Sequence, residues 1–168
     1  DPDISVDDEL KDIEYKTAKL FEARARLGAV LMDAPKDLEE ACASYGRTLG
    51  TAFQLIDDLL DYEGSTVELG KNIGDDLREG KPTLPLLVAM QRGTAEQRDL
   101  IREAIIHGEV ERMPQIVDIV KATGALEATR EAALAQAELA KQCLTELPAS
   151  EFKDALLELA LASIHRSS

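Results

Sequence analysis

The amino-acid sequence predicts an all-α fold, a helical bundle, from three observations. Apolar residues recur every three or four positions along almost the whole chain, which is the period of an amphipathic helix. Few stretches alternate apolar and polar residues, and only 4% of residues are aromatic, so strands are not expected. Glycine and proline fall between the periodic segments, where helices end. Together these features predict about seven helices.

The first two helices have the longest periodic segments. A capping box at residues 5–8 is expected to begin the first helix, which reaches about Leu31 and ends in a turn at residues 33–35. The second helix is expected to run from near Asp37 to about Tyr62. Apolar residues cover most of its C-terminal half, which predicts that this part is largely buried.

A polar stretch with four glycines, residues 63–80, predicts a loop. A short buried helix is expected over residues 84–90, ending at Gly93, with Pro82 and Pro85 near its first turn. The rest of the chain predicts four further helices, the first beginning at a Thr94–Gln97 capping box and the last two covering about residues 126–147 and 150–165. The boundaries between them are expected at Gly108, Pro114, Gly124 and Pro148.

The composition favours one cytoplasmic domain. The 168 residues, 45% of them apolar, are enough for a core in a single all-helical domain over residues 1–168. Cys42 and Cys143 match neither a disulfide framework nor a zinc site, which favours a reducing cytosol. No apolar run approaches the roughly 18 residues that span a bilayer. The net charge of −14 repels nucleic acid and anionic membranes, so neither is an expected partner.

Three aspartates near the end of the second predicted helix indicate a metal site. Asp58 and Asp61 are three residues apart, and Asp57 and Asp61 four. Gln54 precedes Asp57 by three, so all four side chains share one helix face. Like charges at such spacings cost roughly 0.2–0.5 kcal/mol per pair, and burial costs more. A hard divalent cation such as Mg²⁺ removes this cost; the alternative is a solvated acidic stripe, or pairing with Lys and Arg.

Four further residues have the chemistry of a phosphate site. Lysine is a compact positive charge suited to phosphate, and a neighbouring hydroxyl adds a hydrogen-bond donor. The candidates are Lys16 with Thr17 in the first helix, Lys71 in the glycine-containing loop, and Lys81 just before Pro82. Each lysine alone is compatible with an ordinary surface position, and spacing does not bring them together.

These residues resemble the trans-polyprenyl diphosphate synthases. GTAFQLIDDLLD at residues 50–61 is similar to the second aspartate-rich motif of that family. LGKNIGDDL at 69–77 and EGKPTLP at 79–85 continue the resemblance, and KTAKLFEA at 16–23 is similar to the family's Lys-Thr helix. Among subgroups, the sequence most resembles bacterial octaprenyl diphosphate synthases, which feed quinone biosynthesis. The resemblance implies the C-terminal portion of the isoprenoid synthase fold.

The resemblance also implies roles for individual residues. Asp57, Asp58 and Asp61 match aspartates that bind Mg²⁺, directly or through water. The diphosphate-binding residues would be Lys16, Thr17, Gln54, Lys71 and Lys81. The catalytic residues would be Lys16, Thr17, Gln54, Asp57 and Lys71. Asp76 matches a loop acid near the metal, and Arg166 is compared with a basic residue that closes over the second diphosphate.

The implied activity is that of a prenyltransferase, a homodimeric transferase of isoprenoid biosynthesis. It joins isopentenyl diphosphate to an allylic diphosphate by ionisation, condensation and elimination. The family's first aspartate-rich motif has no counterpart here, because residues 7–12 have the wrong spacing. The chain also opens on residues 1–3 without methionine. We therefore expect a fragment lacking upstream helices, inactive by itself.

Three alternatives remain open at the sequence level. A terpene cyclase would use the same metal chemistry with cyclisation of the cation. A non-catalytic partner subunit of a prenyl synthase is the second, although such subunits commonly lose the metal aspartates. An acidic helical interaction domain without a ligand is the third. Product length and the allylic primer do not follow from the sequence.

Overall fold

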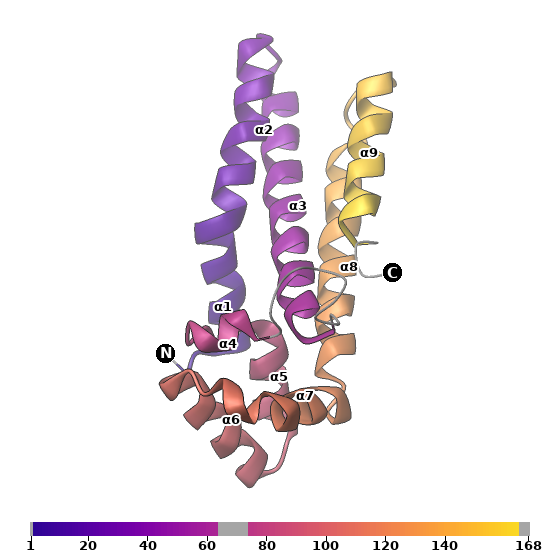
Figure 1. Ribbon diagram of the computed structural model, residues 1–168. Helices are drawn as coiled ribbons and strands as arrows, with labels where there is room; N and C mark the ends of the chain where they lie inside the picture. The colour runs from indigo at the N-terminus through magenta and orange to yellow at the C-terminus, as the bar shows by residue number, and fades with distance from the viewer. Residues whose placement is uncertain (1, 64–73, 165–168) are drawn as a thin grey trace. The chain divides into compact units, whose positions relative to one another are not determined.

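The computed structural model describes residues 2–63 and 74–164. Every regular element within these residues is a helix (Figure 1), so the predicted all-α class is confirmed. The chain forms two compact units: unit 1 comprises Asp1–Leu10 and Asp57–Arg130, and unit 2 comprises Lys11–Ile56 and Glu131–Ser168. The single domain over residues 1–168 stays a prediction.

The first predicted helix is interrupted by a π turn. Helix α1 (Val6–Ile13) is capped by Ser5, whose Oγ accepts the N–H of Asp8 at 3.1 Å. The π-helix η1 (Glu14–Ala18) follows, in which the N–H of Lys19 bonds to the carbonyl of Glu14, five residues earlier. Helix α2 (Lys19–Leu31) continues with α-helical dihedral angles at the junction. The prediction of one uninterrupted helix was therefore wrong at residues 14–18.

Helix α3 (Lys36–Glu63) confirms the second predicted helix and lies beside α2 within unit 2 (Figure 1). The two backbones approach closely at two glycines of α3. A Cβ at Gly46 would stand 2.5 Å from the carbonyl oxygen of Phe21, and one at Gly50 would stand 3.0 Å from the Cα of Ala18. Larger side chains at these positions would push the helices apart. Helix α3 passes from unit 2 to unit 1 between Ile56 and Asp57.

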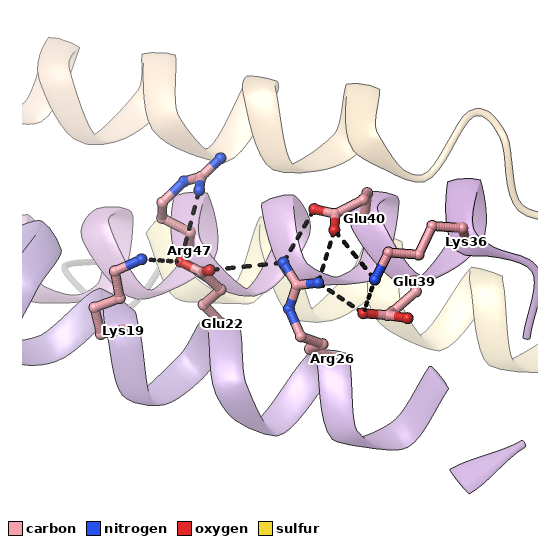
Figure 2. A network of polar contacts seen from close by, with 7 residues as sticks. All are labelled: Lys19, Glu22, Arg26, Lys36, Glu39, Glu40 and Arg47. Carbon is pink, nitrogen blue, oxygen red and sulfur yellow. Dashed lines mark hydrogen bonds and ion pairs between the residues drawn. The ribbon is translucent and has the colours of Figure 1, made fainter. Parts of the chain in front are cut away.

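A network of ion pairs also joins α2 to α3 (Figure 2). The Glu22 carboxylate of α2 lies 3.0 Å from Lys19 and 3.6 Å from Arg47 of α3. Arg26 of α2 lies 2.7 Å from both Glu39 and Glu40 of α3, which also pair with Lys36. Because both helices contribute acids and bases, the network fixes their register as well as their distance.

The core of unit 2 connects α3 with α8 (Ala125–Cys143) and α9 (Glu151–Ile164). Its buried residues are Tyr45, Leu49, Ala140, Leu144 and Ala160. The Tyr45 hydroxyl donates to the carbonyl of Leu156 at 2.9 Å, which ties α3 to α9. Small alanines on α8 and α9 allow these helices to pack closely.

Unit 1 contains short helices from the middle of the chain. They are α4 (Asp75–Arg78), α5 (Leu84–Arg92), α6 (Ala95–His107), the 3-10 turn η2 (Val110–Arg112) and α7 (Met113–Ala122). Reciprocal bonds between Thr94 and Gln97 confirm the predicted capping box. Gly108 and Gly124 end helices with positive φ, as expected of glycine. Helix α4 lies in the predicted loop, after Gly74 (φ 86°), and was not predicted; residues 64–73 are outside the described part.

Over residues 2–63 and 74–164, no helix is both long enough and apolar enough to cross a bilayer. Cys42 and Cys143 are free thiols.

Candidate active site

The three aspartates lie in the last two turns of α3, within unit 1. Asp58 is 2% exposed and Asp61 is 8% exposed, while Asp57 is half-buried. Because the helix is continuous through these residues, the three- and four-residue spacings place Asp61 one turn beyond Asp57 and Asp58. Buried carboxylates of this kind need compensation by cations or hydrogen bonds.

Asp61 contacts the start of α4. The backbone N–H of Asp76 donates to Asp61 Oδ2 at 3.3 Å. Burial raises the pKa of Asp61, and the neighbouring charge of Asp76 raises it further, against the backbone N–H groups of residues 74–76, which lower it. The net shift is upward. The backbone N–H groups therefore only partly offset the cost of burying the ionised Asp61 carboxylate beside Asp76.

Lys81 is joined to the same region through Asp76. Its Nζ lies 3.1 Å from Asp76 Oδ1 and 2.7 Å from Glu79 Oε2. The pKa of Lys81 is raised, first by the hydrogen bond with Glu79 and also by Asp76. The lysine is therefore firmly cationic, and its side chain is 54% exposed. Asp61, Asp76 and Lys81 thus form a connected polar group in unit 1.

Two contacts that anchor the end of α3 were not predicted. The Tyr62 hydroxyl lies 3.4 Å from Thr83 Oγ1 in a buried pair, and burial raises the pKa of Tyr62. Arg130 of α8 donates to both carboxylate oxygens of Glu63 at 2.7 and 2.6 Å. The partners are 21 and 67 residues apart, so no local sequence signal could have identified them.

The remaining candidates lie in unit 2 or outside the described residues. Lys16 and Thr17 lie in the π turn η1, with the exposed Lys16 paired with Asp12. Thr17 Oγ1 donates to Gln54 Oε1 of α3 at 3.1 Å, which brings two predicted site residues together. Lys71 and Arg166 lie outside the described residues, so the structure does not place them.

The aspartates suit a magnesium site that a ligand completes. Among the residues that the structure describes, no group of three or more His, Cys, Asp or Glu side chains is arranged to hold a metal ion. Mg²⁺ usually binds one or two carboxylates, with water and substrate phosphates in the other octahedral positions. The donors offered by Asp57, Asp58 and Asp61 are all oxygens, as this ion prefers. Convergence of all three on one ion stays a prediction.

Residues 1–120 of the chain match the family described as polyprenyl synthetase. The chain belongs to the polyprenyl synthetase family. This family match covers all the described candidate residues, from Lys16 to Lys81. The predicted resemblance is therefore confirmed at the level of the family.

Two curated members of the polyprenyl synthetase family illustrate the similarity. The chain is 46% identical to octaprenyl diphosphate synthase of Escherichia coli (strain K12), over 99% of this chain and 52% of that protein. It is 43% identical to the all-trans-nonaprenyl-diphosphate synthase (geranyl-diphosphate specific) of Rhodobacter capsulatus, over 98% of this chain and 50% of that protein. The chain thus spans about half the length of the curated relatives it matches.

A solved structure of a polyprenyl synthase supports the fold. The protein from Caulobacter crescentus CB15, complexed with calcium and isoprenyl diphosphate, superposes with a TM-score of 0.92 and 40% sequence identity. The superposition covers 100% of this chain and 52% of that one. The predicted isoprenoid synthase fold is confirmed for this portion.

Proposed function

We propose that a protein containing this chain elongates an allylic diphosphate with isopentenyl diphosphate to a long-chain trans-polyprenyl diphosphate. The observation that carries the proposal is the pair of buried carboxylates, Asp58 and Asp61, at the end of α3. Burial raises the pKa of Asp61, so a nearby cation would stabilise its ionised form. The metal ion of a metal-bound diphosphate would be that cation, and Lys16, Lys71 and Lys81 are the lysines proposed to bind the diphosphate.

In the proposed reaction, the residues of this chain bind the metal and stabilise the negative charge of the diphosphate leaving group. When bound, Mg²⁺ supplies positive charge close to the diphosphate leaving group. Lys16, Lys71 and Lys81 stabilise the negative charge that grows on the diphosphate as the allylic C–O bond breaks. Asp57 holds the metal and is not a nucleophile. The double bond of isopentenyl diphosphate attacks the allylic cation, and loss of a proton, with diphosphate as the base, restores an alkene.

The finer assignments follow from the family and are part of the proposal. We assign Mg²⁺ as the cofactor, a homodimer as the assembly, the cytoplasm as the location and quinone side chains as the use of the product. The two curated relatives described above differ in the product that their names state, octaprenyl and nonaprenyl diphosphate. The length of the product is therefore left open within the long-chain class.

Activity can be tested in a chimera in which the N-terminal half of E. coli octaprenyl diphosphate synthase precedes this chain. With Mg²⁺, an allylic primer and radiolabelled isopentenyl diphosphate, we expect long-chain polyprenyl diphosphate as product. The 168 residues alone are expected to give none, because they span about half of that relative. A folded, dimeric chimera that forms no product, or forms a cyclic terpene, would refute the proposal.

A further inference from the structure

The α4 turn, residues 74–81, carries two residues of the candidate site. Asp76 donates its N–H to Asp61, and its side chain pairs with Lys81. Backbone bonds make the turn compact: the N–H of Arg78 bonds to the carbonyl of Gly74 at 3.0 Å, and the N–H of Lys81 to that of Asp76 at 2.9 Å. Because Asp76 and Arg78 lie on the same single turn of helix, a displacement of Arg78 also displaces Asp76.

The end of α6 lies against the α4 turn at two backbone positions, both within unit 1. A Cβ added at Gly108, the residue that ends α6, would stand 2.8 Å from the carbonyl oxygen of Arg78. A Cβ added at Gly80 would stand 3.1 Å from the carbonyl oxygen of Ile105, a residue of α6 that is only 3% exposed. These contacts reach backbone atoms, which cannot rotate aside as the end of a side chain can. The end of α6 therefore limits where the α4 turn can lie.

Gly108 meets a requirement beyond that of ending its helix. Its φ of 63° is left-handed, a conformation that glycine adopts without the steric cost of a Cβ. Gly124, which follows α7, has nearly the same φ, 67°. A Cβ at Gly124 would meet only Arg92 Nη1, at 3.5 Å, which is an ordinary contact with the end of a side chain. The two glycines therefore share the left-handed backbone, and only Gly108 has the close approach to α4.

We infer that Gly108 is a positioning residue, which lets the end of α6 approach the Arg78 carbonyl and so sets the place of the α4 turn. Through this turn it places the Asp76 N–H that bonds to Asp61, and the ammonium of Lys81. Gly108 acts through these residues and does not itself bind a ligand. That Asp61 and Lys81 serve a metal-bound diphosphate rests on the proposed function. The contact between α6 and the α4 turn is a property of the chain by itself, so it can be measured without metal or substrate.

The first test compares Gly108→Asn with Gly124→Asn by NMR of the 168-residue chain without metal. Asparagine tolerates the left-handed region better than most residues with a Cβ, so the two variants differ mainly in the contact with α4. We expect the amide proton of Asp76 to move upfield in Gly108→Asn, because its bond to Asp61 is weakened, and to stay in place in Gly124→Asn. An unchanged Asp76 signal in Gly108→Asn, or equal shifts in both variants, would overturn the inference. If Gly108→Asn does not fold, Gly80→Asn tests the same contact from the less crowded side and should shift Asp76 likewise.

The second test measures the Mg²⁺ concentration that gives half-maximal activity in the chimera described above. Asp76 bonds to a proposed metal ligand, and loss of such a partner typically weakens metal affinity or activity by about tenfold or more. We therefore expect the Mg²⁺ requirement to rise about tenfold in Gly108→Asn and to stay at the wild-type value in Gly124→Asn. A lower melting temperature of Gly108→Asn with an unchanged Mg²⁺ requirement would show a merely structural role and refute the inference. An inactive wild-type chimera would count against the proposed function, and the NMR comparison would then decide the inference alone.

Discussion

The backbone N–H of Asp76 donates to the side chain of Asp61, 15 residues earlier, at 3.3 Å. This bond joins the end of α3 to the start of α4 in unit 1. The Asp76 side chain in turn contacts Lys81. A buried acid, a backbone donor and a cation are thus connected beside the candidate metal ligands. Burial and the charge of Asp76 raise the pKa of Asp61, so a cation bound beside this carboxylate would stabilise its ionised form.

Asp61→Asn should separate binding from folding. The amide keeps an oxygen for the N–H of Asp76 and removes a charge that burial disfavours, so the melting temperature without metal should be unchanged or higher. In the chimera, kcat/KM with Mg²⁺ should fall by at least about a hundredfold. The control is Asp118→Asn, the same change at an exposed site on α7. Equal activity of the two variants would contradict the assignment of Asp61.

The close contact between α2 and α3 predicts opposite effects of two Gly→Ala substitutions. At Gly46, the new Cβ would meet backbone of α2 at 2.5 Å, and overpacking of this kind costs about 1–3 kcal/mol. At Gly28, in the interior of α2, nothing lies within 4 Å of the new Cβ. There the helix propensity of alanine should stabilise the protein by about 0.5–1 kcal/mol. Urea unfolding measures both, and a stabilised Gly46→Ala would contradict the packing.

The Arg26 network predicts a loss of stability in acid. The guanidinium of Arg26 and the ammonium of Lys36 hold the pKa values of Glu39 and Glu40 below their ordinary range. The folded state therefore favours the ionised acids. Their contribution is present above the unfolded pKa of about 4.3 and is lost as pH falls through the lower folded values.

Arg26→Gln should remove this contribution. The urea midpoint of the variant should lie below that of the wild type at pH 7, and the gap should shrink as the pH falls below 4. Arg98, an exposed arginine of α6, provides a matched Arg→Gln control with little expected effect. A gap that stays constant with pH would show that Arg26 acts through packing and not through charge.

Tyr45 predicts a loss of stability in alkali. Burial raises its pKa to about 12, from an ordinary value near 10. Its contribution is thus complete below pH 10 and is lost as pH rises toward the folded value. Tyr45→Phe removes the hydrogen bond to Leu156 and should cost about 1 kcal/mol at pH 7. The gap between wild type and Tyr45→Phe should close above pH 10 in urea unfolding; Tyr15→Phe, at an exposed site, should show no such gap.

Much of the fold was predictable because its signals are local. The Thr94–Gln97 box, the turn near Asp33 and the glycines after α6 and α7 act within a few residues of the helix ends they define. The π turn at residues 14–18 was not predictable, since its sequence has the ordinary composition of an α-helix. Helix α4 was missed because neighbouring glycines indicated a loop.

The candidate site was predictable only in its residue types. Helical spacing placed Gln54 and the aspartates on α3, but it carried no information on Asp76 or Thr83, which reach α3 through tertiary contacts. Thr17 illustrates the difference. A hydroxyl next to a lysine indicated a phosphate contact, which stays a prediction, and spacing gave no sign of the hydrogen bond that Thr17 donates to Gln54, 37 positions away.

The most direct measurement of the central claim is calorimetric titration of the 168-residue chain with inorganic diphosphate, with and without Mg²⁺. If the carboxylates at the end of α3 hold a metal-bound diphosphate, heat should appear only with Mg²⁺ and disappear in Asp58→Asn and Asp61→Asn. Absence of heat under both conditions, or equal binding in a metal chelator, would contradict the account.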